Sequence, residues 1–256
     1  MVFDQVAFAV IVLWALKVCA SLALIGKLIW TRLIAVYPWL FLFVAAEIAE
    51  TILRIGFHEQ EVQIYRGAEI VRTVLAVAVL WELVRLGFEG YSALSAFIRK
   101  ASWYMIAGCL AFSFLNWAFD PTLPEGRSPM LHETLAAVRA VTSGLFAYLL
   151  LLIGFMGWFP VRMRRNVAFL LVGLAAYFSA RWLALLGSNL SPDDTSRMRV
   201  FELAVVAACA VSWTFLLTRE GERTQTITGH RWNPAEMARL SKKLDAINTG
   251  LVRMGP

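Results

Sequence analysis

The sequence is poor in charged residues. Only 16% of its 256 residues are Asp, Glu, Lys or Arg, whereas soluble domains average about 25%. Hydrophobic residues make up 59% and the mean hydropathy is +0.65, which is too apolar for a chain that must present a polar surface to water. The composition excludes an ordinary soluble enzyme, a disordered chain and collagen, and it predicts an all-α polytopic membrane protein.

Residue types that carry catalytic and metal chemistry are also scarce. The chain has three cysteines and three histidines, and Cys19, Cys109 and Cys209 lie in different hydrophobic segments, which argues against a disulfide or metal set. No glycine-rich phosphate loop, HExxH or GxSxG motif occurs. We therefore expect no cofactor, no nucleic-acid partner and no enzyme activity. An enzyme acting on lipid phosphate esters stays open as an alternative, because acids and arginines lie at the level of the head groups.

Two short groups of residues are weak candidates for a metal site. His58 with Glu61, and His132 with Glu133, are all expected on the same side of the membrane. Imidazole and carboxylate ligands suit divalent metals. The residues lie in loops with no shared periodicity, so solvated loop charges are the better interpretation.

Seven segments are long and apolar enough to span a bilayer, which requires about 20 residues. They are 6–29, 37–57, 68–88, 101–119, 135–159, 167–186 and 200–218. The prolines at 38, 121, 124, 160 and 192 fall at or between their ends, as expected of residues that interrupt helices. Residues 1–218 therefore form a transmembrane domain, and residues 219–256 form a tail.

The basic residues predict the orientation. Lys and Arg follow segments one, three, five and seven, and cytoplasmic loops are the ones enriched in these residues. They are Lys27, Arg32, Arg99, Lys100, Arg162, Arg164, Arg165 and the tail residues from Arg219 to Lys243. The N-terminus is thus expected outside and the C-terminus inside, in the cytoplasmic membrane of a bacterium. The net charge of +6 therefore reflects the orientation in the membrane and does not indicate binding to nucleic acid.

Charged residues within the segments are the best candidates for function, because an ionisable group at membrane depth costs several kcal/mol unless it is paired or hydrated. Eight of them converge on the outer half, four of each sign. They are Glu47, Glu50, Arg54, Glu69, Arg72, Arg139, Arg181 and Glu202. Two interpretations remain open: a structural ion-pair network, or an outward-facing polar cavity for a small polar or anionic ligand, which arginines would bind. Lys17, midway along the first segment, lies at a different predicted depth.

The tail carries an amphipathic helix, expected over 234–254. Asn233 is a good N-cap, Pro234 suits the first helical position, and Glu236 completes a capping box. Apolar residues follow at heptad spacing. The proposed partner-binding residues are Met237, Leu240, Leu244, Ile247 and Leu251. This helix can pair in a homodimer or dock on a cytoplasmic signalling or assembly partner, or it can lie on the inner membrane surface or fold back on the bundle.

Several short stretches resemble a family of uncharacterised bacterial seven-span membrane proteins. These are Tyr37-Pro38, Tyr65 with Glu69, Trp81-Glu82-Leu83, Gly87-Phe88, Tyr91, and in the tail Arg231-Trp232-Asn233-Pro234 and Leu244-Asp245-Ala246-Ile247-Asn248. The layout is also similar to the seven-helix sensor regions that precede bacterial histidine kinases, although no kinase or cyclase domain follows the tail. The resemblance implies a membrane sensor or interaction protein. A small transporter and a structural subunit of a larger membrane complex are the alternatives.

Overall fold

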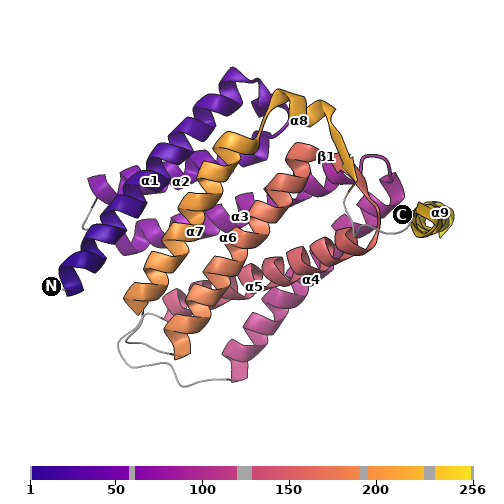
Figure 1. Ribbon diagram of the computed structural model, residues 1–256. Helices are drawn as coiled ribbons and strands as arrows, with labels where there is room; N and C mark the ends of the chain where they lie inside the picture. Colours follow the sequence, from indigo (N-terminus) through magenta and orange to yellow (C-terminus); the bar gives the residue numbers. More distant parts are fainter. Residues whose placement is uncertain (1, 58–60, 120–128, 191–194, 228–233, 255–256) are drawn as a thin grey trace.

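The computed structural model of the protein describes residues 2–57, 61–119, 129–190, 195–227 and 234–254. Within these ranges, long helices make up most of the chain (Figure 1). In chain order the elements are α1 (Val2–Trp30), η1 (Leu33–Ala35), α2 (Pro38–Gly56), α3 (Glu61–Gly87), α4 (Ser92–Phe119), α5 (Pro129–Trp158), β1 (Arg162–Arg164), α6 (Arg165–Leu190), α7 (Thr195–Leu216), α8 (Arg219–Arg223), β2 (Gln225–Ile227) and α9 (Pro234–Met254).

Each of the seven predicted segments corresponds to one of the helices α1 to α7, although four of the segments run one or two residues past the helix end. The helices α3 and α4 begin earlier than predicted, at Glu61 and Ser92, because helical structure continues into polar flanks that a hydropathy criterion leaves out. Three helices begin at a proline, at Pro38, Pro129 and Pro234. Proline suits this position because the first backbone N–H groups of a helix have no intrahelical acceptor.

The long helices pack side by side into one bundle (Figure 1). The pairs α1 and α7, α6 and α7, α5 and α6, α4 and α5, and α2 and α3 are neighbours. The helix α3 contacts α2, α4, α5 and α6 and so lies in the interior. Side chains on α3 can therefore reach several other helices, and two of its charged residues do so.

Four of the described helices are long and apolar enough to cross a membrane, fewer than the seven predicted. They are Val10–Trp30, Ala140–Trp158, Arg165–Ala184 and Arg197–Leu216. The helices α2 and α3 have 19 and 27 residues, so their length is sufficient at 1.5 Å per residue. Charge separates them from the four: α2 carries Glu47, Glu50 and Arg54, and α3 carries six charged residues.

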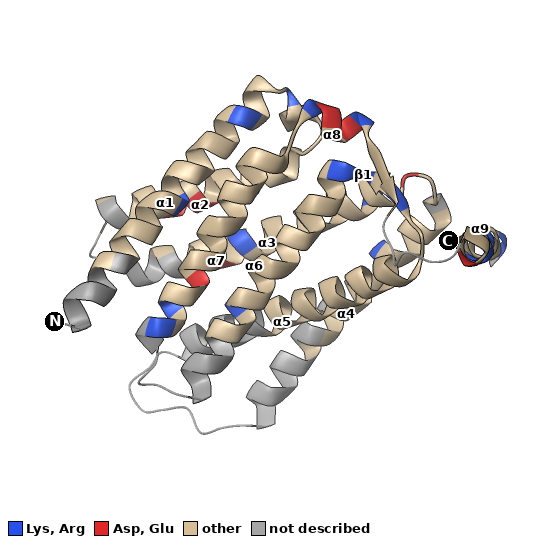
Figure 2. Ribbon diagram, in the orientation of Figure 1, with Lys and Arg blue, Asp and Glu red and all other residues tan. Residues whose placement is uncertain are grey.

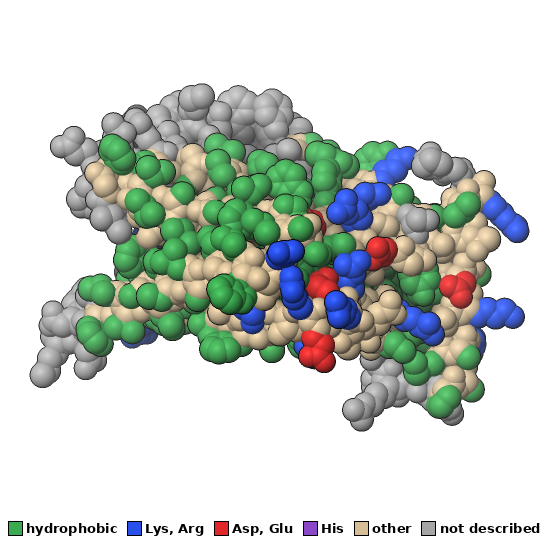
Figure 3. All heavy atoms as spheres, turned by 90° about the horizontal axis from the view of Figure 1, so that it is seen from above, with side chains coloured by type: hydrophobic (Ala, Val, Ile, Leu, Met, Phe, Trp, Pro, Cys, Tyr) green, Lys and Arg blue, Asp and Glu red, His purple; other side chains and the backbone are tan. Residues whose placement is uncertain are grey.

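The core is apolar, and so is much of the outer surface. Leu24, Leu83, Leu149 and Leu174 are among the fully buried side chains. Large apolar side chains are also exposed on several helices, most of all Trp30, which is 89% exposed. Figure 3 shows apolar side chains over much of one face, with Lys and Arg gathered toward the end formed by α8 and α9. An exposed apolar surface of this extent is expected where lipid is the solvent.

The end of the bundle that carries α8 is closed by a polar junction, which we call the α8 junction. Glu222 of α8 accepts hydrogen bonds of 2.5 Å from the Tyr37 hydroxyl and from Asn166 Nδ2. Arg164 of β1 contacts Glu222 at 3.2 Å and Glu89 at 2.6 Å. Burial lowers the pKa of Arg164, but the bonds to Glu89 and Glu222 outweigh this and raise it. Residues from four parts of the chain are thus joined, and β1 pairs with β2 beside them.

Asn166 and Thr218 complete the α8 junction. Asn166 is fully buried and donates a 2.8 Å hydrogen bond to the Thr218 carbonyl oxygen. The Thr218 hydroxyl caps α8 by accepting from Gly221 N at 3.0 Å. A side chain at Gly221 would collide with Asn166, whose Oδ1 would lie 2.0 Å from a Cβ. The described part of the tail before α9 thus contains a short helix, α8, and a strand, β2.

The helix α9 lies across the bundle. It is seen end-on in Figure 1, while the long helices are seen from the side. It packs against α4, where Leu244 is completely buried and Asn248 Oδ1 accepts a 3.2 Å hydrogen bond from Leu94 N. It extends over Pro234–Met254, and Pro234 is the first helical position that the capping residues predict.

Candidate functional site

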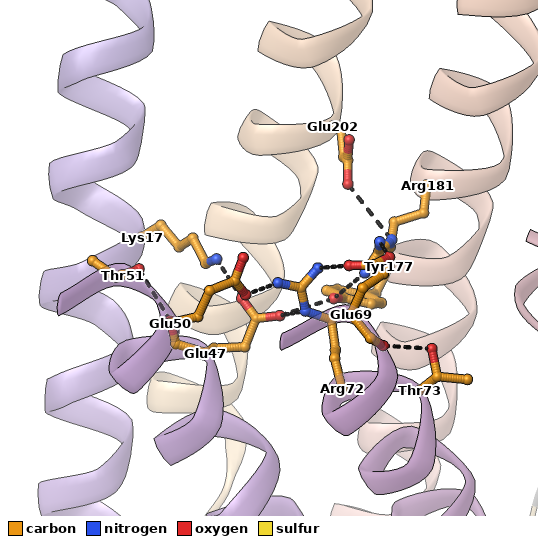
Figure 4. Close-up of polar contacts among 10 residues, drawn as sticks. All are labelled: Lys17, Glu47, Glu50, Thr51, Glu69, Arg72, Thr73, Tyr177, Arg181 and Glu202. Atoms are coloured by element: carbon orange, nitrogen blue, oxygen red, sulfur yellow. Dashed lines mark hydrogen bonds and ion pairs between the residues drawn. The ribbon is translucent and has the colours of Figure 1, made fainter. Parts of the chain in front are cut away.

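Charged side chains from five helices meet midway along the bundle (Figures 2 and 4). We call this group the charge cluster. It consists of Lys17 of α1, Glu47 and Glu50 of α2, Glu69 and Arg72 of α3, Tyr177 and Arg181 of α6, and Glu202 of α7. On α2, α3 and α6 the paired members are three or four residues apart, a spacing that places them on one face of a helix.

Arg72 is the centre of the cluster and contacts three carboxylates. Its Nη1 donates a 2.7 Å hydrogen bond to Glu69 Oε2, and its Nη2 donates to Glu50. Its Nε lies 2.6 Å from Glu47 Oε1 but is out of line for a hydrogen bond, so this contact is an ion pair. A guanidinium offers five N–H donors in one plane, which lets it serve several carboxylates at once. Arg72 thus ties α3 to α2.

Glu69 connects Arg72 to Arg181. Its Oε2 accepts from Arg72, and its Oε1 accepts from Arg181 Nη2. The Glu69 side chain is buried, so both of its oxygens are satisfied inside the protein. Because Arg181 is on α6, this carboxylate ties α3 to α6.

Tyr177 closes the chain of contacts into a ring. Arg181 Nη1 donates to the Tyr177 hydroxyl at 3.3 Å, and this hydroxyl donates to Glu47 Oε1 at 3.1 Å. Glu47, Arg72, Glu69, Arg181 and Tyr177 therefore form a closed polar ring from three helices. The ring contains two carboxylates and two guanidinium groups, so it is formally neutral. Mutual compensation of this kind is what buried charges require.

Three charged residues attach to the polar ring from outside. Lys17 pairs with Glu47 Oε2, and Glu50 pairs with Arg72. Glu202 lies 3.6 Å from Arg181 Nε, and its side chain is 33% exposed, against 16% for Lys17 and 8% for Glu50. The cluster then has three cations and four carboxylates. Glu202 is its longest and most exposed contact.

A cavity lies beside the cluster between α1, α2, α6 and α7. It is small, with a volume of about 20 Å³ open to the centres of water-sized molecules. Lys17, Ser21, Glu47 and Tyr177 are its polar lining residues, and the rest of its wall is apolar or aromatic, as with Phe43. The Lys17–Glu47 pair therefore borders a space that is mainly hydrophobic.

The structure brings together six of the eight residues predicted for the ligand site. They are Glu47, Glu50, Glu69, Arg72, Arg181 and Glu202. The side chains of Arg54 and Arg139 lie outside the part of the chain that the structure describes. Glu202 is the partly exposed member, and the other five carry most of the mutual contacts.

Sequence reasoning missed two members of the cluster. Tyr177 is four residues before Arg181, and this spacing on one helical face was a usable signal. Lys17 was assigned to another depth, yet it reaches Glu47. Counting residues along a segment gives the depth of a side chain only if the helix is upright, and helices in membranes are tilted by about 20°. A lysine side chain is also long, so its ammonium group can lie far in depth from its Cα atom.

The tail residues predicted to bind a partner have different environments. Leu244 is buried against the rest of the chain, whereas Ile247 is 41% exposed. Met237, Leu240 and Leu251 are half-buried. The centre of the heptad seam is therefore occupied within the protein itself.

The described residues contain no group of three or more His, Cys, Asp or Glu side chains that could hold a metal ion. Of the weak metal candidates, His58 and the side chains of Glu61, His132 and Glu133 lie outside the described part. Cys19 is exposed and Cys209 is buried, and both are free thiols. Comparison of the chain with protein-family models, curated proteins and solved structures gives no match.

Proposed function

We propose that this protein is an integral membrane sensor whose charge cluster receives a small anionic ligand from the outer side. In this proposal all seven helices α1 to α7 cross the membrane. Four apolar helices support it directly by length and composition. The charges that set α2 apart pair inside the bundle, at least for Glu47 and Glu50, and paired charges facing the interior are tolerated in a membrane helix.

The orientation is proposed from the basic residues. Lys27 of α1 donates to the Thr214 carbonyl oxygen of α7 at 2.5 Å, and Arg219 donates to the Thr31 carbonyl oxygen at 2.7 Å. Together with Arg164 in the α8 junction, these residues lie at one end of the bundle. Cytoplasmic loops are enriched in Lys and Arg, so the α8 end is assigned to the cytoplasm. The N-terminal end of α7, which leads to Glu202, then faces outward.

The contact between Arg181 and Glu202 carries the proposal for the ligand. Arg181 is held firmly on one side by Glu69 and Tyr177, while its Nε faces Glu202 at 3.6 Å. A carboxylate or phosphate group can take the place of Glu202, because guanidinium groups bind both anions well. The exchange leaves the net charge around Arg181 unchanged for a monoanion, since Glu202 turns to water as the ligand enters.

Exchange at Arg181 also offers a route to the cytoplasmic end. Releasing Glu202 removes an ion pair between α6 and α7. The helix α7 leads directly into Thr218 and the α8 junction, so a shift of α7 relative to α6 would reach that junction. A ligand shifts a conformational equilibrium only if it binds one of the two conformations more tightly than the other. Here the two conformations are those with and without the Arg181–Glu202 contact, and the ligand binds Arg181 more tightly when this contact is absent.

The test measures anion-dependent thermal stability of the purified protein in nanodiscs, followed by tryptophan fluorescence. Inorganic phosphate and acetate are the probes, with chloride at the same ionic strength as the reference. We expect both probes to raise the Tm of the wild type. Glu202→Gln should increase this effect because it removes the internal competitor, and Arg181→Met should abolish it. The matched control, Arg85→Met, removes an exposed arginine of α3 outside the cluster and should leave the effect unchanged.

A structural role is the second candidate, and the closure of the polar ring favours it. Each member of the ring contacts two others by a hydrogen bond or an ion pair, as expected of a network that fixes helix packing. The two roles give different results with Glu202→Gln. If neither probe stabilises the wild type or Glu202→Gln beyond chloride, the cluster is a packing device and the sensor proposal fails.

A further inference from the structure

We propose that α9 binds anionic phospholipid head groups of the inner leaflet through one basic flank. This flank consists of Arg239, Lys243 and Ile247, and we call it the outer stripe of α9. The inference rests on the proposed orientation of the bundle but not on anion binding at Arg181. It assigns a partner to a surface that the charge cluster does not involve.

The position of α9 places it at the depth of the head groups. Asn248 accepts a hydrogen bond from Leu94, which lies in the first turn of α4. The helix therefore packs where α4 begins, at the α8 end of the bundle. Its axis runs across the long helices (Figure 1), so it lies in the plane of the membrane surface if those helices span the bilayer. Amphipathic helices that bind membrane surfaces adopt this orientation.

The side of α9 that faces the protein can be identified. Leu244 is buried, and Asp245 lies near Tyr91, just before α4: burial raises the pKa of Tyr91, and the Asp245 carboxylate raises it further. Successive residues of a helix are rotated by about 100°. Lys243 therefore projects to nearly the opposite side from Asp245, away from the start of α4.

The outer stripe combines charge with apolar surface. Arg239, Lys243 and Ile247 follow one another at intervals of four residues, so they lie along one side of the helix. All three are exposed, and among the described residues neither cation of the stripe has a carboxylate partner. Lys242 and Arg253 are exposed on the adjoining surface.

Anionic lipid is the occupant that this combination favours. The inner leaflet carries negative surface charge that attracts basic segments close to it. Ile247 beside two cations suits the boundary between head groups and acyl chains. A protein partner would have to reach the same stripe at membrane level, next to the lipids that surround α4.

The experiment uses the full chain with Cys19, Cys109 and Cys209 replaced by Ala and a bimane fluorophore attached at Ile247→Cys. The protein is reconstituted in nanodiscs of phosphatidylcholine, or of phosphatidylcholine and phosphatidylglycerol in equal parts. We expect the emission to shift to shorter wavelength in the anionic discs. Arg239→Gln combined with Lys243→Gln should abolish the shift, and so should high salt, because it screens surface charges.

Two controls make the result specific. A label at Ala238→Cys, an exposed position on the opposite side of α9, should show no shift. Arg219→Gln with Arg223→Gln, which removes two exposed charges from α8, should leave the Ile247 shift intact. Equal emission in the two discs, or a shift that survives loss of Arg239 and Lys243, overturns the proposal. A second copy or another protein that covers the stripe would also give equal emission in the two discs, and would overturn the proposal in the same way. Neither result affects the anion test at Arg181.

Discussion

Tyr177 and Glu47 meet between α6 and α2, where the tyrosine hydroxyl donates a 3.1 Å hydrogen bond to the buried carboxylate. The same hydroxyl accepts from Arg181, so one oxygen atom joins the two halves of the polar ring. All other members of the ring are charged. Tyr177 is therefore the position at which the ring can be opened without changing its charge.

Replacing Tyr177 by Phe should destabilise the bundle by about 1.5–3 kcal/mol, the range for a hydrogen bond to a charged group. The free energy of unfolding can be measured in mixed micelles by titration with dodecyl sulfate. Tyr104→Phe is the control, because Tyr104 is 69% exposed, and it should change the value by no more than about 0.5 kcal/mol. Equal effects of the two substitutions would mean that ring closure contributes nothing to stability.

Glu47 should be the most sensitive member of the cluster, because Lys17, Arg72 and Tyr177 all contact it. Glu47→Gln leaves buried cations without their carboxylate and should cost about 3–5 kcal/mol. Adding Lys17→Met to this variant should restore part of the loss, since one uncompensated cation disappears. A double-mutant cycle on unfolding free energies measures this coupling. Additive losses would show that Lys17 and Glu47 do not interact.

The contact between α6 and α7 depends on a glycine. A Cβ at Gly173 would lie 2.3 Å from Nε1 of the buried Trp213, so Gly173→Ala must separate the two helices or displace the indole. We expect a loss of about 1–3 kcal/mol, as for other overpacked sites. Gly154→Ala on α5 meets no atom within 4 Å and should be neutral or stabilising. If both variants have the same Tm, the Trp213 indole does not pack closely against Gly173, and this prediction is wrong.

The α8 junction should open when Asn166 is replaced by Ala. This removes the bonds to Thr218 and Glu222 from a fully buried position. We expect faster amide hydrogen exchange over residues 217–227, with exchange in α1 unchanged. The exposed Gln225→Ala on β2 serves as the control. Exchange that is unaffected at 217–227 would show that β1–β2 pairing holds this segment without Asn166.

The sequence predicted the positions of the helices better than it predicted the contacts between them, because helix positions depend on local signals. The start of α9 at Pro234 follows from Asn233, Pro234 and Glu236, because capping depends on neighbouring residues alone. The early start of α4 at Ser92 was missed, since Arg99 and Lys100 interrupt the apolar run that marks a span. Only four of the described helices can span by composition, against the predicted seven. For two of the other three, α2 and α3, the reason is that they carry charges whose pairing a sequence does not display.

Most of the charge cluster was predicted, but its connectivity was not. Convergence of Glu47, Glu69 and Arg181 follows from depth along alternating segments. Which carboxylate meets which guanidinium depends on the rotation and tilt of each helix, and these are set by packing against neighbours. Tyr177 entered the ring for the same reason. A search of the sequence for charged residues alone does not include a tyrosine hydroxyl.

The order in which the members of the charge cluster occur along the chain has a consequence for biogenesis. Glu47, Glu69 and Arg72 lie on α2 and α3, and Lys17 on α1, so these four are synthesised first. Arg181 follows more than a hundred residues after Arg72. During synthesis Glu69 can meet Arg72 early, but its second oxygen must wait for α6. A chain that stops after α5 is thus left with an unmatched acid, and we expect cellular quality control to recognise such a fragment as incomplete.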